Sequence, residues 1–87
     1  MKLVMSIVRD QDAGRIIDAL ISKDHRATRI NTAGGFLKRG NATILVGVAD
    51  EQVDEIIETV QSVCHEGRPA DGFGVLFVLP VAATYKA

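Results

Sequence analysis

The sequence predicts an α+β fold of the ferredoxin-like kind, a βαββαβ sandwich whose four-stranded antiparallel sheet carries both helices on one face. Two observations predict it. Each of two amphipathic helical stretches lies between apolar, β-branched stretches, and the two helical stretches match at a constant offset of 40 residues. The matched residues are Asp10, Ile16, Ile17 and Leu20 with Asp50, Ile56, Ile57 and Val60. The chain therefore reads as two strand–helix–strand halves in a single domain, residues 1–87.

The first half begins with a strand over residues 2–8, whose apolar residues fall on both faces, as is typical of a strand covered on both sides. A helix is predicted over about residues 11–23 from apolar side chains spaced by three and four. Asp10 stands where an N-cap belongs, and Asp12 adds negative charge in the first turn. A second strand is predicted over residues 25–32, before Gly34 and Gly35 interrupt it.

The second half follows a turn at Gly40 and Asn41. A β-branched and aliphatic strand is predicted over residues 43–48, and Asp50 is expected to cap a helix whose apolar stripe ends at Cys64. The acidic residues between 50 and 58 predict a solvated helix face. A loop over residues 65–72 leads to a last strand over residues 73–81, which Pro80 ends or places at the sheet edge.

Composition excludes several classes of protein. A net charge of −1 with 47% hydrophobic residues argues against a disordered chain and against a basic DNA- or RNA-binding protein. The apolar runs are much shorter than the roughly 20 residues of a membrane-spanning helix, and the N-terminal residues lack the pattern of a signal peptide. The single cysteine, Cys64, excludes an intrachain disulfide framework. We therefore expect a cytoplasmic protein without a membrane partner.

Self-association is expected for two reasons. So short a chain buries a limited fraction of its surface, and its core must be aliphatic because only 5% of the residues are aromatic. With both helices on one face of the sheet, the other face exposes part of its apolar side unless a second subunit covers it.

No residue pattern indicates an enzyme or a metal site. His25 and His65 are the only histidines, and each is most simply a solvent-facing or locally hydrogen-bonded side chain. Cys64 lies on an apolar helix stripe and reads as a small buried hydrophobic residue. The fold's metal carriers use a Cys-x-x-Cys loop, and its RNA-binding members use aromatic residues on the middle strands; this sequence has neither. We expect no catalytic residue, no metal and no cofactor.

The stretch from Arg26 to Gly47 carries residues suited to a phosphate. Paired glycines at 34 and 35 allow backbone N–H groups to converge on an anion. Arg26 can add a guanidinium fork and Thr28 a hydroxyl.

The same stretch carries residues suited to a base. Phe36 and Leu37 offer an apolar platform for stacking, and Asn41 has the donors and acceptor that match a purine edge. A hairpin loop whose glycines serve only turn geometry, with Phe36 packed against a neighbour, explains the same residues. The residues alone leave these two interpretations open.

Six segments, spread in order over nearly the whole chain, resemble the PII-like cyclic-di-AMP receptor proteins. They are Ile-Val-Arg-Asp-Gln-Asp at 7–12, Arg-Ala-Thr at 26–28, Gly-Gly-Phe-Leu-x-x-Gly-Asn-x-Thr at 34–43, Gly-Val at 47–48, Val-Asp-Glu at 53–55 and Phe-Val-Leu-Pro-Val at 77–81. The resemblance implies a ferredoxin-like homotrimer without catalytic activity. Such a protein binds the second messenger cyclic-di-AMP in the clefts between neighbouring subunits and signals to an unknown downstream protein.

By matched position, the resemblance implies eight ligand contacts. They are Arg26, Thr28, Gly35, Phe36, Leu37, Asn41, Gly47 and Phe77. The chemistry of these residues agrees with the role, because Arg26 is a natural counter-charge for a cyclic diphosphate and Gly47 lets a ligand approach the strand closely.

The sequence departs from the family pattern in one large feature. Family members usually carry a much longer insertion between the second helix and the last strand, where this chain has only residues 65–72. Gly72-Phe73-Gly74 replaces Gly-Gly-Ala, Ala33 stands where threonine is common, and the C-terminal residues lack the family's aromatic-polar ending. Two alternatives therefore stay open: a PII-like trimer that senses another nucleotide (ATP or ADP) or a small anion, and a ligand-free trimeric adaptor.

Overall fold

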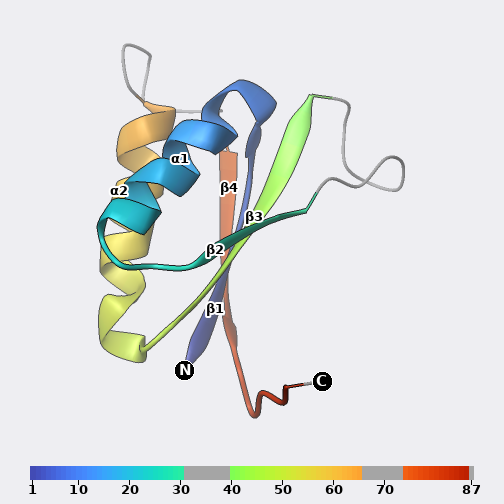
Figure 1. The fold of residues 1–87 in the computed structure, drawn as a ribbon, viewed down its shortest axis with the longest axis vertical. Helices are drawn as coiled ribbons and strands as arrows, with labels where there is room; N and C mark the ends of the chain where they lie inside the picture. The colour runs from blue at the N-terminus through green and yellow to red at the C-terminus, as the bar shows by residue number, and fades with distance from the viewer. Residues whose placement is uncertain (31–39, 66–73, 87) are drawn as a thin grey trace.

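The computed structural model describes residues 1–30, 40–65 and 74–86. Within them the elements are β1 (Lys2–Arg9), α1 (Asp10–Ser22), β2 (Ala27–Ile30), β3 (Asn41–Val48), a 3-10 turn η1 (Asp50–Gln52), α2 (Val53–Cys64) and β4 (Gly74–Pro80). The strands form one antiparallel sheet in the order β2-β3-β1-β4. Both helices lie on the same face of this sheet (Figure 1), which confirms the predicted ferredoxin-like α+β fold.

The core lies between the helices and one face of the sheet. The side chains that fill it alternate along β1 and β3 and recur at helical spacing on α1 and α2. The most deeply buried apolar ones are Val4, Val8, Ile44, Val46, Ile16, Leu20, Ile56 and Val60, none more than 2% exposed. The repeat at an offset of 40 residues is thereby explained, because Ile16 and Leu20 on α1 occupy positions equivalent to Ile56 and Val60 on α2.

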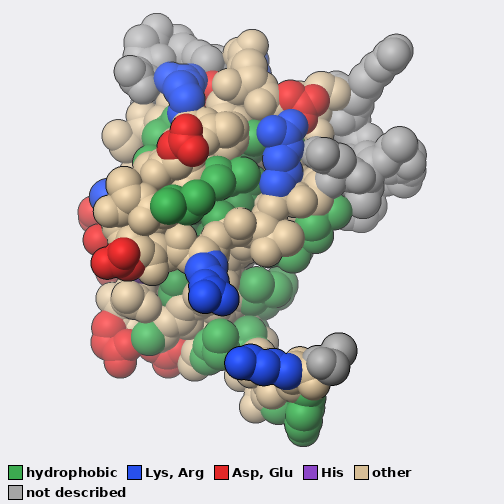
Figure 2. Space-filling model, viewed as in Figure 1, with side chains coloured by type: hydrophobic (Ala, Val, Ile, Leu, Met, Phe, Trp, Pro, Cys, Tyr) green, Lys and Arg blue, Asp and Glu red, His purple; other side chains and the backbone are tan. Residues whose placement is uncertain are grey.

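The opposite face of the sheet, which we call the open face, is strongly apolar. By register it consists of Thr28 and Ile30 of β2, Thr43, Leu45 and Gly47 of β3, Leu3, Met5 and Ile7 of β1, and Val75, Phe77 and Leu79 of β4. Figure 2 shows hydrophobic side chains along the side of the molecule that carries the sheet. Val75 is 51% exposed and Phe77 46% exposed, and the β1 side chains beside them are half-buried, so the described residues of one chain cover this face only in part.

The second predicted strand is shorter than expected at its N-terminal end. The N–H of His25 donates to the carbonyl of Leu20 (3.0 Å), and Asp24 adopts a φ of 64°, so residues 23–26 complete the turn that follows α1. The neighbouring strand β3 begins at Asn41, two residues earlier than predicted. Pro80 ends β4 as predicted, whereas Thr32 and Phe73 lie outside the described residues.

Neither predicted aspartate cap forms, because both carboxylates bind cations instead. Asp10 is the first residue of α1, and its Oδ1 accepts a hydrogen bond from Arg29 Nη2 (3.0 Å). Asp50 begins η1, and its Oδ1 lies 3.0 Å from the ammonium of Met1. The hydrogen bond and the positive charge of that ammonium hold the pKa of Asp50 below its usual range.

The acidic residues at the start of the second helix lie at the surface, as predicted. Figure 2 shows acidic side chains gathered at its lower left, over η1 and the start of α2. The exposed members of this group are Asp50, Glu51, Asp54, Glu55 and Glu58.

Two buried hydroxyls differ sharply in their surroundings. Thr59 Oγ1 donates to the carbonyl of Glu55 (2.7 Å) and accepts a hydrogen bond from Lys23 Nζ (2.9 Å), which links the end of α1 to α2. Ser6 Oγ is fully buried beneath the helices and has no hydrogen-bond partner in the described part of the chain. An unsatisfied buried hydroxyl destabilises the folded state.

Replacing each hydroxyl should therefore change stability in opposite directions. We expect Ser6→Ala to raise the free energy of unfolding by about 1 kcal/mol, and Thr59→Val to lower it by about 1 kcal/mol, since only the second loses hydrogen bonds. Urea denaturation followed by circular dichroism measures both. A Ser6→Ala protein that is less stable than the wild type would show that this hydroxyl has a partner in the folded protein.

Candidate functional site

Three of the predicted ligand residues gather at one end of the open face. The register pairs Ala27 with Val46 and Thr28 with Leu45, and Arg26 comes directly before β2, just outside this ladder. Because side chains alternate along a strand, Thr28 and Gly47 share the side of the sheet that faces away from the helices, and Arg26 lies two residues before Thr28 at the entry to β2. All three are exposed. We call them the β2–β3 cluster.

The β2–β3 cluster combines one cation, one hydroxyl and a bare stretch of backbone. A Cβ at Gly47 would lie 3.3 Å from the tip of the Met1 side chain, so this flexible side chain lies over the glycine and would have to shift for a larger group. Beside it, a pocket of about 500 Å3 opens at the turn between α1 and β2. Its lining is Ile21, Asp24, His25, Arg26, Ala27 and Thr28. A guanidinium and a hydroxyl at the mouth of such a space can hold an anionic group by charge-assisted hydrogen bonds.

His25 fixes the backbone next to the cluster. Its side chain is only 4% exposed, and Nε2 lies 2.8 Å from Glu55 Oε2 on α2. Arg26 therefore lies between a residue anchored to both helices and Ala27, the first residue of β2. The sequence predicted a solvent-facing or locally hydrogen-bonded His25; the ring is instead buried and bound by Glu55, 30 residues along the chain. Cys64 is 4% exposed and belongs to the hydrophobic core, as predicted.

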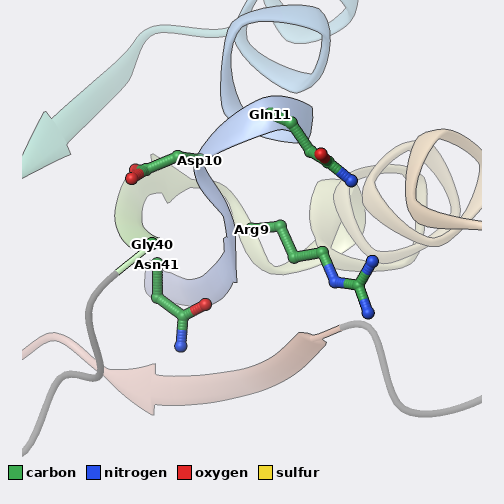
Figure 3. Close-up of a pocket in the computed structure, with 5 residues that line it drawn as sticks. All are labelled: Arg9, Asp10, Gln11, Gly40 and Asn41. Carbon is green, nitrogen blue, oxygen red and sulfur yellow. The ribbon is translucent and has the colours of Figure 1, made fainter.

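Asn41 lies at the other end of β3, in a second pocket of about 420 Å3 (Figure 3). Its lining is Arg9, Asp10, Gln11, Gly40 and Asn41. The Asp10 N–H donates to the carbonyl of Gly40 (2.8 Å), and Gly40 has a φ of 89°, a conformation that favours glycine. Figure 3 shows the Asn41 amide and the Arg9 guanidinium apart from each other, so the two side chains present separate polar groups.

Phe77 lies across the sheet from the β2–β3 cluster. It pairs with Met5, which pairs with Leu45, which pairs with Thr28, so three strand spacings of about 4.8 Å put Phe77 about 14 Å from Thr28. Asn41 and Gly47 are six residues apart on β3, a length of about 20 Å. Thus Thr28, Asn41 and Phe77 do not converge on one point within a single chain.

The remaining predicted contacts, Gly35, Phe36 and Leu37, lie outside the described residues. Sequence reasoning missed Asp10 and His25 as neighbours of the predicted contacts. Each acts through a partner far along the chain, Arg29 for Asp10 and Glu55 for His25, and no local spacing signals such pairs.

The described residues contain neither a metal-binding cluster nor a membrane-spanning helix. Over residues 1–30, 40–65 and 74–86, no group of three or more His, Cys, Asp and Glu side chains is placed to hold a metal ion. In the same ranges, neither helix has the length and apolar character needed to cross a membrane.

Comparison with solved structures gives a relative of the same size. It is a functionally unknown protein from Pediococcus pentosaceus ATCC 25745, 34% identical, which superposes with a TM-score of 0.80. The alignment covers 99% of this chain and 96% of that chain, so the two proteins have nearly the same length. The relative therefore shares the total chain length that goes with the short connection between α2 and β4.

Comparison with protein families gives one model, described as the cyclic-di-AMP receptor, which matches residues 1–70. The matched range contains every element from β1 to α2, including the whole β2–β3 cluster and Asn41. The chain therefore belongs to the cyclic-di-AMP receptor family.

Proposed function

We propose that this protein is a non-enzymatic, PII-like signal-transduction protein that binds cyclic-di-AMP in clefts between the subunits of a homotrimer. The observation that carries the proposal is the β2–β3 cluster, in a chain that belongs to the receptor family. The protein would act in the cytoplasm and pass its signal to a downstream protein.

The chemistry of the cluster suits a cyclic dinucleotide. The Arg26 guanidinium and the Thr28 hydroxyl supply charged and neutral donors for phosphate oxygens, and Gly47 lets a ribose or base lie close to β3. The amide of Asn41 has donors and an acceptor for an adenine edge. These groups bind and orient a ligand, and none of them forms or breaks a bond in it.

The separation of Thr28, Asn41 and Phe77 supports the proposal of a site between subunits. A ligand that touches Phe77 as well as Arg26 and Thr28 needs the Phe77 of another copy, because within one chain Phe77 is about 14 Å from Thr28. The open face supports such assembly, because its exposed Val75, Phe77 and Leu79 are the apolar side chains that subunit interfaces bury.

Ligand titration tests the proposal directly. We expect isothermal titration calorimetry to give saturable binding of about one cyclic-di-AMP per subunit, in preference to ATP and cyclic-di-GMP. Arg26→Ala should weaken binding about 10- to 100-fold, as expected for loss of a hydrogen bond to a charged group. Lys23→Gln, which also removes one positive charge, is the matched control and should bind like the wild type. Equal binding by Arg26→Ala and Lys23→Gln would exclude Arg26 from the site.

The assembly is tested on β4, where neighbouring residues point to opposite faces. Phe77→Asp places a charge on the open face and should dissociate the trimer, whereas Val78→Asp, on the other side of the same strand, should leave it intact. Light scattering coupled to size-exclusion chromatography measures the mass of each. A wild-type protein that is a stable monomer would rule out a site between subunits.

Stacking is tested at Phe36, a residue predicted from the sequence. Phe36→Ala should weaken adenine-nucleotide binding by about 1–3 kcal/mol without a change in melting temperature, if a base stacks on this ring. Calorimetry and thermal unfolding measure the two quantities separately. Unchanged affinity would remove Phe36 from the pocket.

Two other functions use the same surfaces. A guanidinium, a hydroxyl and an amide can also bind the phosphates of ATP or ADP or a small anion, and competition between nucleotides separates this case from the first. A ligand-free adaptor would need only the apolar open face to form a trimer. In that case Arg26→Ala would alter no binding property of the protein.

A further inference from the structure

We propose that Asp10 is a positioning residue of the ligand site, which holds the end of β2 and the start of β3 against the first turn of α1. The inference rests on the proposed function and deepens it, since it says what fixes Asn41 and the strand of Thr28 relative to each other. Asp10 itself is not among the predicted ligand contacts.

The first contact is made by the backbone of Asp10. Its N–H donates to the carbonyl of Gly40 at 2.8 Å, directly before Asn41. Arg9 pairs with Asn41 in the β1–β3 register, so this hydrogen bond continues the connection one residue beyond the ladder. The start of β3 is thereby tied to the point where β1 becomes α1, and Asp10, Gly40 and Asn41 line one pocket (Figure 3).

The second contact is made by the carboxylate of Asp10. Its Oδ1 lies 3.0 Å from Nη2 of Arg29, the residue after Thr28 on β2. In the sheet order β2-β3-β1-β4, strand β2 pairs with β3 and has no pairing with β1. Asp10 directly follows β1, so the ion pair joins β2 to the start of α1, a link that the strand pairing does not supply.

Together the two contacts make Asp10 a clamp on both strands that carry predicted ligand residues. The backbone contact holds the end of β3 that starts with Asn41, and the side-chain contact holds the strand that carries Thr28. The side chains of Asp10 and Arg29 are 48% and 35% exposed, so the effect of losing the pair should be moderate.

The direction in which Asp10→Asn changes ligand affinity distinguishes a positioning role from a direct electrostatic effect of the charge. Asp10 is an anion near a site proposed for a cyclic diphosphate, so its charge alone opposes binding. If Asp10 acted through its charge, Asp10→Asn would strengthen binding. If it acts as a clamp, the same substitution weakens binding, because the strands are then held less precisely.

Calorimetry with cyclic-di-AMP compares Asp10→Asn and Asp10→Glu with Asp18→Asn. Asp18 is an exposed carboxylate farther along α1, so its substitution removes the same charge without touching the clamp. We expect about a three- to fivefold rise in Kd for Asp10→Asn, the size of effect that an exposed ion pair produces. Asp10→Glu, which keeps the charge, should recover part of the loss, and Asp18→Asn should bind as well as the wild type or slightly better. Unchanged or tighter binding by Asp10→Asn would overturn the inference.

A measurement without ligand keeps this inference separate from the proposed function. In the free protein, Asp10→Asn should speed hydrogen exchange at the amide of residue 10 and shift the amide resonances of Arg29 and Asn41, while Asp18→Asn leaves all three unchanged. If the wild type binds no cyclic dinucleotide, the proposed function is wrong and this comparison alone decides the role of Asp10. Amides that are the same in Asp10→Asn and the wild type would show that the Asp10 carboxylate does not position either strand.

Discussion

The packing of two helices on one face of a four-stranded sheet is the constraint on which the rest of this structure depends. Ile16 and Leu20 of α1 and Ile56 and Val60 of α2 bury the sheet side chains that face them, and they exclude water from that side. Residues 1–30, 40–65 and 74–86 contain only two such helices, so within these ranges the other face of the sheet has no helix against it. The surface available for binding and assembly is therefore a direct consequence of how the core is built.

The same strands serve the core and the candidate site because of strand alternation. On β2, Ala27 faces the helices while Thr28 faces away, and on β3 the buried Val46 precedes the exposed Gly47. The predicted ligand contacts on these strands are thus attached to backbone that the core holds in place. Such an arrangement lowers the entropic cost of ordering the contact residues when a ligand binds. It therefore suits a receptor better than a set of residues on mobile loops.

Local pattern predicted the elements well and the long-range polar contacts poorly. Helical spacing and strand alternation are determined by the packing of neighbouring residues, so α1, α2 and β1 appeared at nearly the predicted bounds. The two aspartate caps failed because Asp10 binds Arg29, 19 residues away, and Asp50 binds the ammonium of Met1. The start of β2 was misplaced because His25 belongs to the turn after α1, where Glu55, 30 residues away, binds its ring. Pairs of this kind depend on the finished fold and leave no periodic trace in the sequence.

The short connection between α2 and β4 bears differently on binding and on signalling. Arg26, Thr28, Asn41 and Gly47 all precede α2, and the contacts that hold them, from Asp10, from Glu55 and from the β2–β3 register, also lie before residue 56. A change in length after Cys64 therefore leaves every described element of the β2–β3 cluster and the Asn41 pocket as it is. What it alters is the chain that joins α2 to β4, the strand that carries Phe77. The solved relative of nearly equal length shows that such a compact chain is not peculiar to this protein. In the proposed function, the predicted ligand contacts that precede α2 are thus independent of this connection. A difference in its length acts on the chain that leads to Phe77.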